Sequence, residues 1–304
     1  MKFSILIPTH RYDCSALVRS LKAQAEALQR SYPGMGDWEI LVCPDGEEMP
    51  MSDYGGARIV RQPVLGGPAA SRNHLVRASH GEYLLFIDAD AEVVTDDFLL
   101  RYAEDCDRAD VVCGALRNPD GPPREGHELR MRYERKAEGR RTATWRNAHP
   151  YDSFSTFNFM ARRQVAESLP FDERSQRYGY EDSLFGLQLQ AYGFSILHTD
   201  NALVHTGIDS NESFLAKTEE ALRSLRRLGE PLQSSVGASR VGRSLGRWGL
   251  LPLLRFVFRH TRGMVRRNLL GRRPSLFLFA FYKLGYYACL KDEKTQTDAV
   301  SSPD

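Results

Sequence analysis

The sequence predicts an α/β protein built on a mixed, mainly parallel sheet flanked by helices. Strand and helix patterns alternate through the first two-thirds of its 304 residues, which is typical of βαβ units. The apolar run at 81–87 has the length of a strand that is buried on both faces of such a sheet. The composition, with 42% hydrophobic and 26% charged residues, is that of a globular protein and excludes a disordered chain.

The expected elements follow the chain in a regular order. Apolar runs predict strands at 2–7, 38–43, 57–61, 81–87, 110–114 and 154–161. Helical patterns are expected at 14–30, 68–78, 96–107 and 181–192. The segment 117–150 is polar and rich in arginine, glycine and proline, which favours a long mobile loop or lid.

The C-terminal part of the chain differs in charge from the rest. The formal net charge is only +2, yet residues 231–291 contain twelve Lys or Arg and no Asp or Glu. An acidic body joined to a basic, apolar segment indicates two domains. We expect a main domain at 1–210, with halves at about 1–116 and 150–210, and a helical amphipathic extension at 211–304.

Positive charge and apolar side chains are combined between about 240 and 290. The run from Ser275 to Leu290 is shorter than the roughly 20 residues of a membrane span, and it contains Lys283. We therefore expect this segment to lie on an anionic membrane surface, with its basic groups toward lipid headgroups and its aromatic side chains inserted. The alternative is a helical subdomain packed on the protein itself or on a partner in a homo-oligomer. Nothing else in the sequence supports nucleic-acid binding.

Asp88-Ala89-Asp90 directly follows the apolar run at 81–87. The carboxyl ends of strands are where open α/β sheets bind ligands. Carboxylate oxygens suit hard divalent cations, which commonly accompany phosphate groups. The motif therefore predicts a metal-nucleotide site, although by itself it is equally typical of a solvated turn.

Further motifs follow in a distinctive order. Pro8-Thr9-His10 ends the first expected strand, Pro44-Asp45-Gly46 ends the second, and the segment from Gly67 to Asn73 opens a helix. Later, Tyr178-Gly179-Tyr180-Glu181-Asp182 opens another helix, and the segment from Asn201 to His205 forms a late strand. In this order, between about residues 3 and 207, the motifs resemble those of the family 2 glycosyltransferases. The resemblance implies the GT-A fold, a Rossmann-like fold that binds nucleotide sugars.

The resemblance also implies a donor site for a nucleotide-diphosphate sugar. The residues that it assigns to the donor are Pro8, Thr9, His10, Asp45, Gly67, Arg72, Asp88, Ala89 and Asp90. Asp45 would bind the base, and Arg72 would approach the base or the diphosphate. A UDP-sugar is favoured, but Pro44 occupies a position that is usually acidic or an amide in the family, which leaves the base open.

A divalent cofactor, Mn²⁺ or Mg²⁺, is implied by the same motifs. Asp90 and His205 would be its ligands, and Asp88 would contact the ribose or orient the ion through water. Such an ion stabilises the negative charge that develops on the leaving diphosphate. Considered alone, His205 is more typical of a hydrogen-bonded structural histidine.

The acceptor side is expected around the helix that begins at Glu181. Asp182 would be the general base, and Glu181 would hydrogen-bond an acceptor hydroxyl; a single displacement predicts inversion of configuration. Two carboxylates at a helix start are equally explained by the helix dipole. Asn158 and Asp152 are further acceptor-binding candidates. The acceptor would be a glycan or a lipid-linked molecule of cell-envelope polysaccharide or glycoconjugate synthesis.

Three other classes of protein share some of these features. A haloacid-dehalogenase-like phosphatase carries Asp-x-Asp on its first strand, whereas here it follows about the fourth. A sugar-nucleotide pyrophosphorylase would have a glycine-rich, lysine-containing signature after the first strand, and a non-catalytic nucleotide- or glycan-binding protein would not need the Glu181-Asp182 pair. Five cysteines without a C-x-x-C pair, and no signal peptide, favour a cytoplasmic location with reduced thiols, peripheral on the inner face of the membrane.

Overall fold

The structure is a computed structural model that describes residues 1–46, 54–62, 65–139, 141–173, 179–228, 232–235 and 237–290. The chain divides into two compact units. The first consists of Met1–Pro123, Met131–Gln176 and Glu181–Ile208, and the second of Arg124–Arg130, Arg177–Tyr180 and Asp209–Asp304. The first unit contains the sheet.

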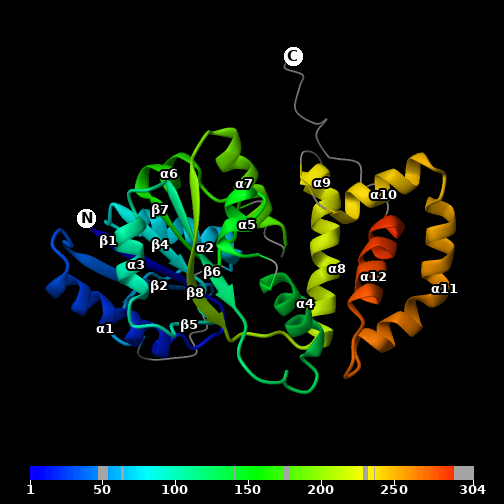
Figure 1. Ribbon diagram of the computed structural model, residues 1–304, viewed down its shortest axis with the longest axis horizontal. Helices are drawn as coiled ribbons and strands as arrows, with labels where there is room; N and C mark the ends of the chain where they lie inside the picture. Colours follow the sequence, from blue (N-terminus) through cyan, green and yellow to red (C-terminus); the bar gives the residue numbers. More distant parts are fainter. Residues whose placement is uncertain are drawn as a thin grey trace, which may run out of the picture. The chain divides into compact units, whose positions relative to one another are not determined.

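The first unit is built on an eight-stranded sheet in the order β3-β2-β1-β4-β7-β6-β8-β5 (Figure 1). The strands are β1 (Phe3–Thr9), β2 (Trp38–Pro44), β3 (Arg58–Ile59), β4 (Tyr83–Ile87), β5 (Ala91–Glu92), β6 (Val111–Arg117), β7 (Asn158–Arg162) and β8 (Ile196–His205). Strands β1 to β4 form parallel pairs, as do β6 and β8, whereas β7 runs antiparallel to β4 and β6, and β5 antiparallel to β8. The predicted mixed, mainly parallel sheet is confirmed.

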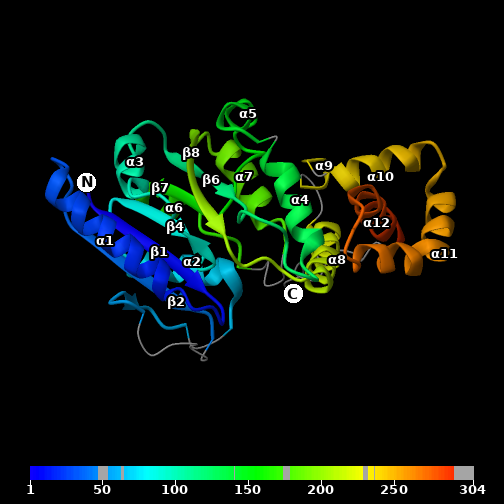
Figure 2. The same ribbon diagram turned by 60° about the horizontal axis from the view of Figure 1, so that its bottom comes forward.

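Helices cover both faces of this sheet (Figure 2). Helices α1 (Ser15–Ser31) and α3 (Phe98–Asp105) pack on one face, and α2 (Gly67–Ala78), α6 (Arg163–Ser168) and α7 (Glu181–Ala191) on the other. Successive residues of β1 point to opposite faces of the sheet. Ile5 and Ile7 belong to the core beneath α1, and Leu6 belongs to the core beneath α2. Burial on both faces explains why the strands are continuous apolar runs.

The expectation of a long loop over 117–150 is wrong. The segment contains α4 (Glu128–Glu138) and α5 (Ala143–Ala148). Helix α4 consists largely of glutamate, arginine, leucine, methionine and lysine, which are good helix formers even without a wide apolar face. Helix α5 begins at a side-chain cap, since Thr142 Oγ1 accepts a hydrogen bond from the backbone N–H of Trp145 at 3.2 Å.

The second unit contains the predicted C-terminal helices. They are α8 (Asn211–Leu228), α9 (Leu232–Ser235), α10 (Gly237–Arg247), α11 (Leu251–Leu269) and α12 (Leu276–Cys289). Their core is formed by apolar side chains of α8, α11 and α12, among them Phe214, Phe258 and Tyr282. No helix in the described ranges combines the length and the hydropathy that crossing a membrane requires. Residues 291–304 lie outside the described residues.

The cysteines are as predicted. All five are free thiols, and Cys14, Cys43, Cys106 and Cys113 are buried. Burial raises the pKa of Cys14 to about 12, which keeps this thiol protonated and unreactive.

Candidate active site

The predicted Asp88-Ala89-Asp90 motif lies at the carboxyl end of β4. The chain turns there, because the N–H of Ala91 donates to the carbonyl of Asp88 at 3.1 Å, and then enters the short strand β5. Strand β5 pairs with β8 so that Ala91 is opposite His205. This register places the residue before Ala91, Asp90, beside the end of β8.

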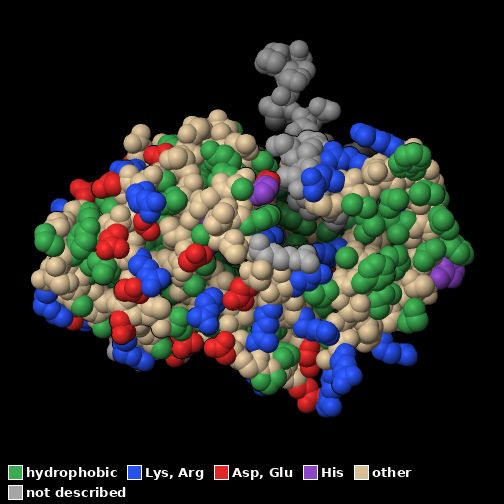
Figure 3. Space-filling model, in the orientation of Figure 1, with side chains coloured by type: hydrophobic (Ala, Val, Ile, Leu, Met, Phe, Trp, Pro, Cys, Tyr) green, Lys and Arg blue, Asp and Glu red, His purple; other side chains and the backbone are tan. Residues whose placement is uncertain are grey.

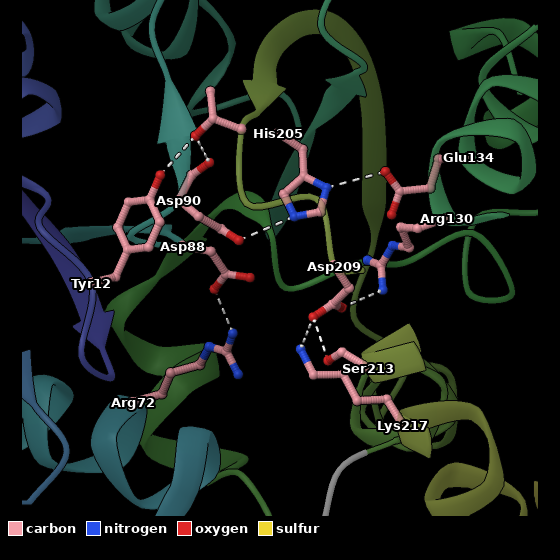
Figure 4. Close-up of polar contacts among 11 residues, drawn as sticks. Tyr12, Arg72, Asp88, Asp90, Arg130, Glu134, His205, Asp209, Ser213 and Lys217 are labelled. Atoms are coloured by element: carbon pink, nitrogen blue, oxygen red, sulfur yellow. Dashed lines mark hydrogen bonds and ion pairs between the residues drawn. The ribbon is translucent and has the colours of Figure 1, made fainter. Parts of the chain in front are cut away.

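Asp90 and His205, the two predicted metal ligands, are in direct contact. Asp90 Oδ2 lies 3.1 Å from His205 Nε2 (Figure 4). Thr206 holds the backbone of this pair in place, since both its N–H and its Oγ1 donate to the carbonyl of Asp90, at 2.9 and 2.7 Å. Gly207 allows the close approach, because a Cβ atom at this position would lie 2.1 Å from Asp90 Oδ2.

Glu134 is a site residue that the sequence did not reveal. It lies on α4, and its Oε2 is 3.1 Å from His205 Nδ1. His205 is only 6% exposed, and its imidazole has a carboxylate at each nitrogen. Burial lowers the pKa of His205, but the hydrogen bonds and negative charges of Asp90 and Glu134 outweigh it and raise the pKa to about 9. In the absence of an ion, the ring is therefore protonated and donates to both carboxylates.

The Asp90–His205 pair fits a divalent cation. Two neighbouring ligands of an octahedral ion with bonds of about 2.1 Å are roughly 3 Å apart, which is close to the observed Oδ2–Nε2 distance. With an ion bound, the imidazole would lose the proton on Nε2 and keep the proton on Nδ1. The Nδ1–H group would then donate a hydrogen bond to Glu134. No cluster of three or more His, Cys, Asp or Glu side chains suited to a metal occurs in the part of the chain that the structure describes. Mg²⁺ sites commonly complete such a sparse protein shell with water and substrate phosphates.

Arg72 and Asp88 form the next part of the site. Arg72 lies on α2, and its Nη2 donates to Asp88 Oδ1 at 2.7 Å. Loss of hydration raises the pKa of Asp88 to about 6, with contributions from the charges of Asp90 and Asp182, while Arg72 lowers it. Arg72 is only 3% exposed, and its Nε and Nη1 are buried without a hydrogen-bond partner among the described residues. Buried N–H groups of a charged guanidinium that lack a hydrogen-bond acceptor destabilise the protein. An anion that accepted hydrogen bonds from them would remove this penalty, so the arrangement is suited to an anion.

Asp45 has an evident structural role. Its two carboxylate oxygens accept hydrogen bonds from the backbone N–H groups of Gly66 and Gly67, at 2.8 and 3.0 Å. These groups precede and begin α2, where free N–H groups favour a negative charge, and Gly67 has a positive φ of 80°. A carboxylate has about four lone-pair sites, so the predicted contact of Asp45 with a base remains compatible with this capping.

The loop after β1 reaches the Asp90 region through Tyr12, a residue that was not predicted. The phenol oxygen of Tyr12 lies 3.0 Å from Thr206 Oγ1, the group that donates to the carbonyl of Asp90. Thr9 is buried and fixes this loop, because its hydroxyl donates to the carbonyl of Tyr12 and its own carbonyl accepts from the N–H of Asp45. Pro8 is half-buried and His10 is exposed beside them, so the predicted Pro8-Thr9-His10 segment borders the site.

The predicted acceptor residues are only partly brought together. Glu181 and Asp182 form the first turn of α7, and Thr156 Oγ1 donates to Asp182 Oδ1 at 2.7 Å. The charge of Asp182 also contributes to the raised pKa of Asp88. Tyr178, which was quoted with Glu181 and Asp182 in the same motif, lies outside the described residues.

Asn158 and Asp152 do not join this group. Asn158 is buried inside the sheet, where its Oδ1 accepts from the hydroxyl of Tyr102 at 2.7 Å and its Nδ2 donates to the carbonyl of Asn201 at 2.9 Å. Its amide is therefore used to join β7 to neighbouring elements and is not available to an acceptor. Asp152 is exposed before β7 and makes no hydrogen bond or ion pair with the described residues.

A separate charged cluster lies in the second unit. Asp209 Oδ1 accepts from Lys217 Nζ at 2.7 Å and from Ser213 Oγ at 3.0 Å, and its Oδ2 lies 3.4 Å from Arg130 Nη1 (Figure 4). The cluster connects the start of α4 with the first turns of α8, and its physical role is to hold these helices together.

Comparison with known proteins gives the family of the chain. Residues 4–169, more than half of the chain, match the model of glycosyl transferase family 2. The chain belongs to this family. It is therefore a glycosyltransferase, and the phosphatase, pyrophosphorylase and non-catalytic alternatives are set aside. No curated protein is matched by sequence.

Solved structures give the fold of this family 2 glycosyltransferase. Glucosyl-3-phosphoglycerate synthase from Mycobacterium tuberculosis, in complex with phosphoglyceric acid, has a TM-score of 0.51 at 18% identity over 78% of this chain and 80% of that chain. The same enzyme in complex with Mn²⁺, UDP and phosphoglyceric acid has a TM-score of 0.51 at 18% identity, over 76% and 79% of the two chains. Mannosyl-3-phosphoglycerate synthase from Rubrobacter xylanophilus has a TM-score of 0.50 at 18% identity, over 75% and 74%. These similarities confirm the predicted GT-A fold.

Proposed function

We propose that this glycosyltransferase moves a sugar from a nucleotide-diphosphate sugar, with a UDP-sugar favoured, to a hydroxyl group of a glycan or lipid-linked acceptor. The observation that carries the proposal is the buried guanidinium of Arg72 beside Asp88, whose Nε and Nη1 atoms have no hydrogen-bond partner among the described residues. A cation with unused donors, next to a carboxylate–imidazole pair suited to a divalent ion, has the chemistry that a diphosphate requires.

We assign the donor and metal roles as follows. Asp90 and His205 would hold Mn²⁺ or Mg²⁺, and Glu134 would orient His205 through Nδ1. When bound, the ion would supply positive charge opposite the leaving diphosphate. Arg72 would bind the diphosphate, and Asp88 would contact the ribose and keep Arg72 in place. The M. tuberculosis enzyme of similar fold was crystallised with Mn²⁺ and UDP, which supports this choice of ligands.

For the acceptor, we propose that Asp182 is the general base. It would take the proton of the acceptor hydroxyl as the acceptor oxygen bonds to the anomeric carbon and the bond from that carbon to the diphosphate oxygen breaks. One displacement of this kind inverts the configuration. The hydrogen bond from Thr156 fixes one oxygen of Asp182, and this supports a positioned base. Glu181, the preceding residue, would hydrogen-bond the acceptor.

The biological setting that we propose is cell-envelope polysaccharide or glycoconjugate synthesis on the inner face of a membrane. The segment at about 240–290 would attach the protein to anionic lipid, since it lies in a stretch of 231–291 that has twelve basic residues and no acidic ones.

The donor chemistry can be tested with Mn²⁺ and a panel of nucleotide sugars. We expect release of nucleoside diphosphate from one of them, stimulated by a suitable acceptor. Asp90→Asn should abolish Mn²⁺-dependent nucleotide binding in calorimetry, while Asp152→Asn, which makes the same change at an exposed aspartate outside the group, should bind like the wild type. Release of pyrophosphate, or unchanged affinity in Asp90→Asn, would contradict the proposal.

A further inference from the structure

Helix α11 carries two apolar faces. Phe258, Val265 and Leu269 are buried in the core of the second unit. Leu253, Phe256, Val257 and Met264 follow one another at intervals of three, one and seven residues, which places them on one stripe of the helix. This stripe points away from the core, since Leu253 and Phe256 are each 60% exposed and Met264 is 68% exposed.

The exposed stripe continues into the segment before α11. Trp248 is 77% exposed and Leu250 is 46% exposed. We call Trp248, Leu250, Leu253, Phe256, Val257 and Met264 the outer stripe. In the space-filling view, hydrophobic side chains gather over α11, with Lys and Arg at the margins (Figure 3). Contiguous exposed apolar side chains with polar margins are typical of surfaces that bind a partner or a membrane.

Helix α12 is arranged differently, and for three of its aromatic side chains this corrects the expectation of insertion in lipid. Phe279, Tyr282 and Tyr287 are buried. A Cβ atom at Gly285 would lie 2.3 Å from the ring of Phe258, so α11 and α12 are closely packed. Although α12 is strongly apolar, these three aromatic side chains are buried within the second unit and are not free to enter lipid.

The charges near the outer stripe indicate the kind of partner. Arg262 and Arg266 are paired within the unit, with Glu219 at 3.2 Å and Glu212 at 3.3 Å. Arg247, Arg259 and Arg267 are exposed, and none has an acidic partner in the described ranges. A partner that is apolar at its centre and negative at its edge matches this surface.

An anionic lipid surface satisfies both requirements. A bilayer provides acyl chains below a plane of phosphates, as an interfacial helix needs. A second copy of this chain fits less well, because a twofold interface sets each surface against itself and would bring unpaired arginines face to face.

We propose that α11 lies in the plane of an anionic bilayer, with the outer stripe inserted at the boundary of headgroups and acyl chains and with Arg247, Arg259 and Arg267 at the lipid phosphates. This proposal rests on the membrane attachment that is part of the proposed function. It adds that the residues inserted in the membrane belong to α11 and the preceding turn.

Vesicle binding by the full chain tests this assignment. We expect co-sedimentation with vesicles of phosphatidylcholine and phosphatidylglycerol, and much weaker binding to phosphatidylcholine alone. Leu253→Ser and Phe256→Ser should each weaken binding by about tenfold, because each removes an inserted apolar side chain. The matched control is Phe277→Ser, which changes an even more exposed phenylalanine of α12 outside the outer stripe and should bind like the wild type.

Insertion itself can be observed at Trp248. Lipids with a quencher on the acyl chain should quench a fluorescence component that is absent in Trp248→Phe. The proposal is overturned if this component is not quenched, if Phe277→Ser loses binding as strongly as Phe256→Ser, or if the stripe variants abolish a dimer and leave vesicle binding unchanged. Measuring nucleoside diphosphate release separates the catalytic proposal from the membrane proposal. Both are supported if variants of the outer stripe still transfer sugar to a soluble acceptor but no longer bind vesicles. An inactive wild type that still binds vesicles through the stripe contradicts only the catalytic proposal.

Discussion

Glu134 Oε2 lies 3.1 Å from His205 Nδ1, on the other side of the imidazole ring from Asp90. The three side chains come from α4, β8 and the turn after β4, and they are separated by 71 and 115 residues in the sequence. A carboxylate that accepts from the remote nitrogen of a metal-binding histidine fixes both the ring orientation and the tautomer. Glu134 is thus a positioning residue for the proposed ion.

Removal of this carboxylate should weaken metal binding without removing a ligand. For Glu134→Ala we expect Mn²⁺ affinity, measured by electron paramagnetic resonance in the presence of nucleotide, to fall about 10- to 100-fold. Glu134→Gln should retain more affinity, because its amide oxygen can still accept from Nδ1. Glu92→Ala removes an exposed carboxylate from the strand beside His205 and serves as the control. Equal losses in Glu134→Ala and Glu92→Ala would show a general effect of charge.

Asp182→Asn should separate binding from chemistry. Affinity for nucleotide and Mn²⁺ should stay near that of the wild type, while kcat falls about 10²- to 10⁴-fold, as expected for the loss of a general base. Calorimetry and steady-state kinetics measure the two quantities. Thr156→Val, which removes the hydrogen bond to Asp182, should give a smaller decrease in kcat. Turnover of Asp182→Asn at the wild-type rate would exclude this residue as the base.

Gly207→Ala tests the close approach of the backbone to Asp90. The added methyl group would collide with Asp90 Oδ2, so the carboxylate must move and lose its distance to His205. We expect a loss of Mn²⁺-dependent nucleotide affinity approaching that of Asp90→Asn, measured by calorimetry. Gly263→Ala is a suitable control, because a Cβ atom there meets no atom within 4 Å. Wild-type affinity in Gly207→Ala would mean that the Asp90 position is not critical.

His198 should make the free energy of unfolding depend on pH. Burial lowers its pKa to about 4, helped by the charge of Arg146 and opposed by the hydrogen bond to the carbonyl of Pro150. Because the unfolded chain binds this proton near pH 6.5, the stabilisation is complete above that pH and is lost as pH falls from 6.5 toward 4. The full loss is on the order of 3 kcal/mol.

Urea unfolding at pH 7.5 and pH 4.5 measures this contribution. The decrease in stability between the two pH values should be smaller in His198→Gln than in the wild type. His80→Gln, at an exposed histidine, should retain the wild-type difference. Equal pH dependence in all three proteins would show that His198 is not the group that titrates.

The sequence predicted where most strands lie along the chain, because strands buried on both faces appear as continuous apolar runs. It failed at α4, where buried Leu129 and Met131 are surrounded by charged residues and the apolar periodicity is weak. The helix propensity of that segment was the available signal, but its arginines and the prolines before it suggested a loop.

Asp90 and His205, which the structure brings into contact, could be nominated from the sequence because each belongs to a short motif at the end of a strand. Glu134, Tyr12 and Gly207 were missed, because their roles depend on which elements the fold places together. Asn158 was predicted to bind the acceptor, but its amide makes hydrogen bonds to Tyr102 and Asn201 inside the sheet. Polar residue type alone does not distinguish a ligand-binding amide from one that joins strands.

The pairing of β5 with β8 has a consequence for how this enzyme tolerates change. Strand β5 is only two residues long, and its register alone sets Ala91 opposite His205. Side chains alternate between the faces of a strand, so a one-residue deletion in β8 before His205 would turn the imidazole to the opposite face. Many substitutions along β8 would leave that alignment intact, whereas a single insertion or deletion would dismantle the Asp90–His205 pair at once. Length, more than composition, is the constraint on this strand.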